Sequence, residues 1–581
     1  MNILQSQAFE INKDVLTFIN QNYDRLVKSG LLMPSFLASL NIKEATDLLR
    51  KSFFQEPSVM NICTYNKLLN EFLKRVQRAR YETFILNLAS AYEGYRFYLP
   101  AFLDFRGRIY RSGVLHFHER DLARSLIVFS GSSNQNELDS DKMQEVHKVL
   151  TSSAAFHYMK FTSYDDAHQW YLDHKCVFNS SEESLIQFAV DASKPFQFIS
   201  NVLCIEGDKT DPTIIPITQD ASASAYQLMS YLLLNKELAM RTNLIPTDGR
   251  KINDVYTFFL EELKDYLKIH FDPALSEIIC PRLTRQLIKG LFMPMIYGKT
   301  IISMTADIKV HFSNFLSASE CYQLASHCSK FWNEKFPDII NLMKLVRNIG
   351  WFSSARDLPV YYSIPTFTTV QDYMKTQAVN IWLYDRLHKK RRQVTLRIPT
   401  DIRDRRKTEV ATFANFIHQK DAWIAMNMVE RLQNIGAPVY TVHDNFISTA
   451  LFAKEIPLEY ILVFNDKFIC HPLHLINRYI DKNVCKNFMS SYYNINEPIP
   501  LDGLKHILER FIPKDLSKKQ KLTWDRKIDS IVDAYKSYVH TVCVRPYNTE
   551  TEPSIIDDKW NNFVYEMLKW ANYDYNYSLH L

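Results

Sequence analysis

Two isolated carboxylates stand beside apolar runs of the chain, and Asp444 is the first of them. It lies in the stretch YTVHDNF, between an apolar run that begins at Ala437 and a second one that begins at Phe446. This pattern predicts a strand, a tight turn that contains Asp444, and a second strand. Asp and Asn favour turns because their side chains hydrogen-bond to nearby backbone, so turn structure alone can explain Asp444.

The second carboxylate is Asp220, which follows an apolar segment from Ile214 to Ile217 and precedes a helical segment that opens through Ser222. It is a candidate helix N-cap, because Asp readily accepts hydrogen bonds from the free amides of a first turn. Alternatively, two carboxylates from separate elements can hold two divalent cations about 3.5 to 4 Å apart for phosphoryl transfer. The second interpretation requires Asp220 and Asp444 to meet.

A basic helix is predicted between the two carboxylates, in the segment RLTRQLIKGLFMPMIYG. Arg285 and Lys289 are four residues apart, so they lie on one helical face and can point at the same anion. Pro294 is expected to break or kink this helix before Tyr297 and Gly298. Such a pair also occurs on many solvated helices, so its meaning depends on the rest of the chain.

The elements that must position these residues are mainly helical. Apolar periodicity predicts helices from residue 1 to about 100 and from 240 to 350, whereas 131–200 is polar at first and then helical. With 581 residues, the chain can bury a large core and is expected to form several lobes. We therefore predict a mixed α+β fold that is predominantly helical.

Charge and hydropathy restrict the partners of the protein. The formal net charge of +5 is too small to indicate nucleic acid by itself. The stretch 386–407, however, holds ten Lys or Arg against two Asp, which favours a basic loop near nucleic acid. No apolar stretch has the 18 or more residues of a membrane span, so no membrane partner is expected.

Five motifs occur in one order along the chain, and together they are far more specific than any one of them. They are DFRGRIY (104–110), DASASAYQ (220–227), RQLIKGLFMPMIYG (285–298), NFIHQKD (415–421) and VHDNF (442–446). In this order and approximate spacing, the chain resembles the single-subunit, bacteriophage and mitochondrial type of DNA-dependent RNA polymerase. The resemblance extends from about residue 75 to 450.

This resemblance implies a right-hand polymerase fold with thumb, palm and fingers. The implied regions are a helical thumb-like region at 1–95, the first part of the palm at 96–240 with an insertion at about 131–200, the fingers at 241–414 with the basic loop 386–407, and the second part of the palm with the C-terminal region at 415–581. The implied activity is template-dependent transfer of ribonucleotides to the 3′ end of RNA by a two-metal mechanism.

The resemblance also implies roles for individual residues. Asp220 and Asp444 correspond to the catalytic carboxylates that hold two Mg²⁺ ions, Lys289 to the catalytic lysine, Arg285 to a triphosphate contact, Tyr297 and His418 to residues near the incoming sugar, and Arg106 and Arg108 to arginines that follow the nucleic acid. The implied partners are a DNA template, the RNA product and ribonucleoside triphosphates.

Composition and the N-terminal sequence lead to an expectation about origin. Residues encoded by A+T-rich codons are abundant, and the first residues show no transit-peptide pattern. The protein therefore looks like an organelle-encoded member that works in the mitochondrion and is carried on a linear plasmid. Only about 100 residues precede DFRGRIY, so the resemblance suggests an accessory factor for promoter opening, or a truncated gene product.

Two alternatives remain at this stage. A related family A-like DNA polymerase would also have two palm aspartates and a fingers helix with Arg, Lys and Tyr. DFRGRIY and the His418 context argue against it, because that family's pattern supplies neither. A truncated, non-catalytic nucleic-acid-binding relic is the other alternative. Against decay, Asp220, Lys289, Tyr297 and Asp444 are all present.

Overall fold

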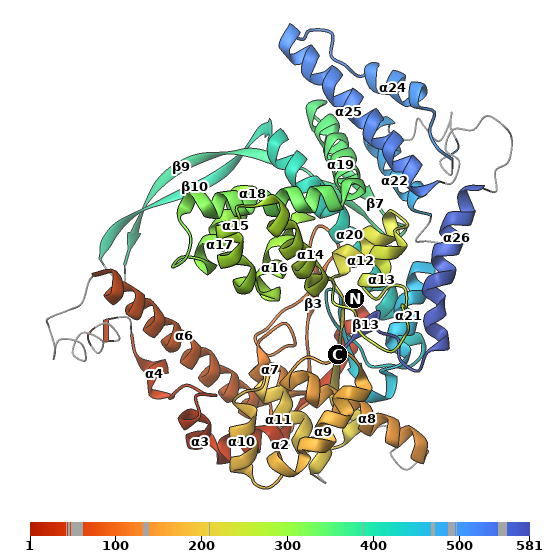
Figure 1. The fold of residues 1–581 in the computed structure, drawn as a ribbon. Helices are drawn as coiled ribbons and strands as arrows, with labels where there is room; N and C mark the ends of the chain where they lie inside the picture. Colours follow the sequence, from red (N-terminus) through yellow and green to blue (C-terminus); the bar gives the residue numbers. More distant parts are fainter. Residues whose placement is uncertain are drawn as a thin grey trace.

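The computed structural model describes residues 1–581 except 42, 45–46, 48–61, 132–138, 208–209, 387–388, 466–470, 486–493, 495–496 and 544–554. Within the described residues, helices predominate and the strands form five small sheets (Figure 1). The predicted fold class, mixed α+β and mainly helical, is therefore confirmed. None of the helices in these ranges is both long and apolar enough to cross a membrane.

A four-stranded antiparallel sheet joins distant parts of the chain in the order β11-β12-β6-β13. Its strands are β6 (Pro216–Ala221), β11 (Tyr440–Val442), β12 (Asn445–Thr449) and β13 (Leu579–His580). The strand, turn and strand predicted around Asp444 are confirmed as β11 and β12. The strand expected to begin at Ile214 begins instead at Pro216, because residues Pro212–Ile214 form a 3-10 helix capped by Asp211.

Helices α12 (Ser224–Leu232) and α20 (Arg405–Asn434) carry the chain away from and back to this sheet. Asp404 caps α20 by accepting a hydrogen bond from the Lys407 amide, which satisfies one of the free donors of the first turn. Buried apolar side chains recur along α20, among them Phe413, Phe416 and Ile424. This helix therefore runs through the main core, which it shares with α12.

The N-terminal region departs from the predicted all-helical pattern. Strand β1 (Ala8–Ile11) pairs with β2 (Phe97–Tyr98) and β5 (Ile127–Phe129), and buries Phe9 and Ile11. A strand forms here because alternate residues point into one core, and its partners lie far away in sequence. The expected long helix is present as α6 (Ile62–Tyr92), and it ends before the residues that form β2.

Two helical groups agree with the sequence. The segment expected to become helical within 131–200 contains α8 (Ser140–Tyr158), α9 (Tyr164–Phe178), α10 (Glu182–Ala189) and α11 (Pro195–Glu206). The group expected at 240–350 contains α14 (Val255–His270), α15 (Pro273–Ile279), α16 (Arg285–Phe292), α17 (Ile301–His311), α18 (Ala318–Lys335) and α19 (Pro337–Ala355). Figure 1 shows the second group in green, above the first.

The stretch 386–407 is not a loop, and this prediction was wrong. It contains strand β10 (Lys390–Arg403) and the start of α20, while β10 pairs with β9 (Met374–Asp385) from Lys390 opposite Asp385 to Arg403 opposite Met374. Alternating β-branched residues and a partner strand outweigh the high charge density. Most side chains of the β9–β10 hairpin are exposed, and Figure 1 shows it as a long arm.

The remaining elements complete the main body. The C-terminal part has α21 (Glu455–Asn465), α22 (Pro472–Ile480), α24 (Leu501–Glu509), α25 (Lys518–Val542) and α26 (Ile555–Leu568). Short hairpins are formed by β3 (Ala101–Leu103) with β4 (Ile109–Arg111) and by β7 (Val360–Ser363) with β8 (Thr368–Gln371). The short helices are α1 (Asn2–Ser6), α2 (Lys13–Gln21), α3 (Tyr23–Lys28), α4 (Phe36–Ser39), α7 (Asp121–Ser125) and α13 (Lys236–Arg241).

Candidate active site

The central sheet brings the two predicted carboxylates together. In the pairing of β6 with β12, Asp220 lies opposite Asn445, whose chain neighbour is Asp444. Protein packed around the Asp220 carboxylate restricts its hydration, and this partial burial together with the negative charge of Asp444 raises its pKa to about 7. Asp220 nevertheless remains accessible to solvent. It is not a helix cap, because α12 begins at Ser224 and has no side-chain cap.

The turn that presents Asp444 is a two-residue hairpin loop between Val442 and Asn445. Its first turn residue, His443, has φ = 61°, a left-handed conformation that costs a non-glycine residue roughly 1–2 kcal/mol. Two aromatic contacts hold His443 in this position. Its ring centroid is 5.1 Å from that of Tyr110 and 5.8 Å from that of His118.

The chemistry of this pair fits Mg²⁺. Among the described residues, no group of three or more His, Cys, Asp or Glu side chains is arranged to hold a metal ion. Mg²⁺ does not require such a cage, because it commonly binds through one or two carboxylates together with water and substrate phosphates. The negative charge of Asp444 contributes to the raised pKa of Asp220, and a cation bound between the two carboxylates would neutralise the repulsion between them.

Arg285 and Lys289 lie on one face of α16, as predicted. The Lys289 Nζ and the Arg285 Cζ lie 5.8 Å and 5.7 Å from the centroid of the Tyr256 ring. The positive charge of Lys289 acts to lower the pKa of Asp220, so this lysine lies close enough to that carboxylate for its charge to act on it. Arg285 forms an ion pair with Asp254, and its Nη2 donates to Asp254 Oδ1 at 3.0 Å. Helix α16 ends at Phe292, ahead of Pro294 as expected.

Tyr297 and His418 stack on each other although they come from distant segments. Their ring centroids are 4.9 Å apart with an interplanar angle of 30°. Arg106 Nη1 lies 2.7 Å from His418 Nδ1, and because arginine can only donate, this nitrogen is the acceptor. Burial and the charges of Arg108 and Arg106 lower the pKa of His418 to about 3, so its ring is neutral with the proton on Nε2.

The DFRGRIY motif forms the turn between β3 and β4, and both of its arginines are bound within the protein. Arg106 Nε donates to Asp104 Oδ2 at 2.8 Å, and Arg108 Nη2 donates to Asp421 Oδ2 at 2.7 Å. Gly107 is required here, because a Cβ atom at this position would lie 2.1 Å from the Phe367 ring. Contact of these arginines with nucleic acid stays a prediction.

Sequence reasoning missed several neighbours of these residues. Lys160 is exposed, and burial and the positive charges of Arg285 and Lys289 lower its pKa, so it belongs to the same basic surface. His580 lies opposite Asp220 in β13, and its Nε2 is 2.7 Å from Ser222 Oγ. Neither residue has a local signal, whereas Asp421, the partner of Arg108, already stood inside NFIHQKD.

Comparison with known proteins gives the family. The arrangement of two carboxylates opposite a basic helix is suited to phosphoryl transfer to or from a polyphosphate. A family model described as DNA-dependent RNA polymerase matches residues 149–469. The chain belongs to the DNA-dependent RNA polymerase family.

Individual relatives agree with this assignment. A Zea mays protein named "Probable DNA-directed RNA polymerase" is 35% identical over 82% of this chain and 47% of its own length. A protein of the same name from Agaricus bitorquis is 28% identical over 87% of this chain and 46% of its own length. "DNA-directed RNA polymerase, mitochondrial" from Schizosaccharomyces pombe is 26% identical over 62% and 33%. The chain thus spans about half the length, or less, of these relatives.

Asp220→Asn should stabilise the metal-free protein at high pH. The pKa of Asp220 is raised from 3.8 to about 7, so between these values the folded protein keeps a proton that the unfolded chain releases. The stability of the folded state therefore falls as pH rises through this window. In a chelator, thermal unfolding should give a higher Tm for the variant than for the parent protein at pH 8.5, and a smaller difference at pH 5. An equal difference in Tm at both pH values would contradict the link between the raised pKa of Asp220 and the stability of the fold.

Proposed function

We propose that the protein is a DNA-directed RNA polymerase that transfers nucleotides from ribonucleoside triphosphates to the 3′ end of RNA on a DNA template. The observation that carries this proposal is the single sheet in which β6 and β12 bring Asp220 beside Asp444, with Lys289 of α16 close enough for its charge to act on Asp220. Family membership supports the same reaction.

Under this proposal, the four-stranded sheet is the floor of a polymerase palm. The fingers contain α14 to α19 and extend over 241–414, while the region 1–95 with α6 serves as the thumb. The palm then combines 96–240 with 415–581. The pairing of β6 with the β11–β12 hairpin and with β13 supports a palm assembled from both segments.

Asp220 and Asp444 would hold two Mg²⁺ ions, and the chemistry supplied by bound Mg²⁺ would be activation of the RNA 3′-hydroxyl and stabilisation of the leaving pyrophosphate. Lys289 offsets negative charge that develops on the transferred phosphoryl group or donates a proton to the leaving group. Arg285 and Lys160 contact the triphosphate, and Arg285 exchanges its partner Asp254 for phosphate oxygens. The Asp254 pair keeps the guanidinium on the correct side of α16 before the nucleotide arrives.

Tyr297→Phe should weaken discrimination between ribo- and deoxyribonucleotides. Tyr297 stacks on His418, and a site built to hydrogen-bond a substrate hydroxyl rejects the analogue that lacks it, because a polar group is then left unpaired. We expect the ratio of kcat/KM for ribonucleotides to that for deoxyribonucleotides to fall about 10-fold or more. Tyr322→Phe, at an exposed tyrosine of α18, is the matched control. An unchanged ratio would exclude Tyr297 as the sugar sensor.

Extension of an RNA primer on a DNA template, with ribo- and deoxyribonucleotides offered separately and Mg²⁺ present, tests the proposed function. RNA extension with ribonucleotides is the expected result. Preference for deoxyribonucleotides in the unmodified protein would favour the family A-like DNA polymerase. Template binding without extension of either kind would favour the non-catalytic relic.

The partners and location are part of the same proposal. The template is DNA, the product is RNA, and an accessory factor assists promoter opening. We place the protein in the mitochondrion, which is supported by the relatives named as mitochondrial from Schizosaccharomyces pombe and Nicotiana tabacum. The exposed, basic β9–β10 hairpin is the proposed element for reading duplex DNA.

A further inference from the structure

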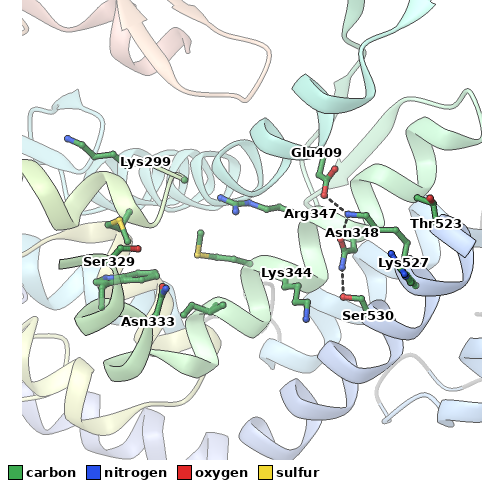
Figure 2. Close-up of a pocket in the computed structure, with 16 residues that line it drawn as sticks. Lys299, Ser329, Asn333, Lys344, Arg347, Asn348, Glu409, Thr523, Lys527 and Ser530 are labelled. Atoms are coloured by element: carbon green, nitrogen blue, oxygen red, sulfur yellow. Dashed lines mark hydrogen bonds and ion pairs between the residues drawn. The ribbon is translucent and has the colours of Figure 1, made fainter. Parts of the chain in front are cut away.

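A cavity of about 670 Å³ lies apart from the carboxylates, where α18, α19 and α25 meet the turn after α16 (Figure 2). Five basic residues and one acidic residue line it: Lys299, Lys344, Arg347, Arg526, Lys527 and Glu409. Small-molecule sites are usually lined mainly by apolar and aromatic side chains. The excess of positive charge instead indicates a ligand that carries several negative charges.

Part of this charge is already paired, including that of Lys299, which forms an ion pair with Asp307, and part of it is available. Lys527 Nζ contacts Glu409 Oε1 at 2.5 Å and Asn348 Oδ1 at 2.9 Å (Figure 2). Lys344 and Arg526 are exposed on two different helices, α19 and α25. Among the residues that the structure describes, neither of them has an ion-pair partner. Two free cations therefore stand on separate helices that line one cavity.

The guanidinium group of Arg347 independently indicates that a hydrogen-bond acceptor from a ligand binds here. Its Nε and Nη2 atoms are buried and, within the described part of the chain, have no hydrogen-bond partner. Burial lowers the pKa of its guanidinium, and the nearby charge of Glu409 acts in the opposite direction. A buried charged donor without a partner carries an uncompensated cost of desolvation, so ligand oxygens at this position would stabilise the protein.

The cavity also lies next to the turn that carries Tyr297, a residue proposed to contact the incoming nucleotide. Figure 2 shows Arg347 extending from its helix toward the side of the cavity where Lys299 lies. Its Nη2 is so close to Gly298 that a Cβ atom there would lie 2.5 Å away. Gly298 directly follows Tyr297, which stacks on His418. A ligand in the cavity would therefore contact the turn that carries Tyr297, on its Gly298 side.

We propose that this cavity binds the phosphodiester backbone of the single template strand close to the base being copied. The inference rests on the proposed polymerase function. Phosphate groups satisfy Lys344, Arg347 and Arg526 at once, because each guanidinium or ammonium group binds anionic oxygen. Among the described residues that line the cavity, Trp332 is the only aromatic one, and it is only 2% exposed, so none of them offers an open ring face to a base. The contact is thus to the backbone and independent of sequence.

A double variant, Lys344→Glu with Arg526→Glu, tests the proposal without touching residues of the candidate active site. Lys521→Glu is the matched control, since Lys521 is exposed on the same helix α25 but does not line the cavity. The probe is a fluorescent DNA duplex with a single-stranded 5′ template overhang, compared with the blunt duplex. Binding is measured by anisotropy without nucleotides, over a series of salt concentrations, and circular dichroism confirms that each variant is folded.

The double variant should bind the overhang template about 10-fold more weakly than the parent protein, with little change for the blunt duplex. Loss of two phosphate contacts to a single strand should reduce the salt slope by about 1.4. A neutral methylphosphonate at one overhang position should weaken binding by the parent protein and have no further effect on the double variant. Lys521→Glu should behave as the parent protein does.

Three outcomes would overturn the proposal. One is unchanged binding of the overhang template, and the second is an equal loss for Lys521→Glu, which would indicate only a general charge effect. The third is a higher KM for free nucleotide with unchanged strand binding, which would assign the cavity to a mononucleotide. Strand binding is measured without catalysis. A parent protein that fails to extend RNA would therefore overturn the proposed function, and the effect of the double variant on strand binding could still be interpreted.

Discussion

Asp444→Asn should lower kcat for RNA extension by at least about 10³-fold, which corresponds to roughly 4 kcal/mol of lost transition-state stabilisation. Asp444 stands at the tip of the β11–β12 hairpin, and its charge is felt by Asp220 on the neighbouring strand. An amide keeps the size of the side chain but removes the negative charge that holds a cation. The hairpin itself should survive, because Asn is well tolerated in turns.

Single-turnover extension of an RNA primer, with binding of the primer and template measured in parallel, checks this result. Affinity for the primed template should stay within about threefold of the parent protein, since the role proposed for Asp444 is to hold metal ions and not the strand. Asp502→Asn is the control, because Asp502 is an exposed acid in the first turn of α24. Extension at more than a tenth of the parent rate would remove Asp444 from the catalytic pair.

Lys289→Ala should reduce kcat by about 10² to 10³-fold while leaving template affinity nearly unchanged, which is the range for removal of one preorganised charge at a reacting group. Lys289 is exposed on α16, lies over the Tyr256 ring at 5.8 Å, and carries a positive charge that acts on Asp220. Under the proposed function, its ammonium group contacts the triphosphate bound at the carboxylates. An interaction that strengthens only in the transition state lowers kcat and kcat/KM together.

Lys309→Ala provides the matched control for Lys289→Ala, since Lys309 is an exposed lysine on the next helix, α17. Lys289→Arg should restore part of the rate if positive charge is what the reaction requires. Rapid-quench extension over a range of pH separates charge stabilisation from proton donation, because only the latter adds a titrating step. A rise in KM with kcat unchanged would reduce Lys289 to a general phosphate contact.

Local sequence was enough to predict the elements that carry most of the groups proposed to perform chemistry, whereas the roles of these groups came from the resemblance of five motifs to a known family. The turn at Asp444 follows from turn-forming residues between two β-branched runs, and α16 follows from its periodicity, its i, i+4 basic pair and the proline beyond its end. These features depend on contacts within a few residues, so the amino acids that form them also encode them. The same reasoning failed at β1, whose partner strands lie far away in sequence, and at β10, where the high charge density hid a hairpin with the neighbouring strand β9.

The relations between these groups arise only in three dimensions. Strand register places Asp220 opposite Asn445, and hydrogen bonds join Arg106 to His418, Arg285 to Asp254 and Arg108 to Asp421. In its own segment, each residue of these pairs has no feature that indicates its partner. The free energy of each contact depends on how the folded protein buries the two side chains together. The sequence by itself determined which side chains are present and the local elements that carry them. Packing of remote elements around one sheet determined which of them meet, because long-range contacts have no local periodicity or spacing that reveals them.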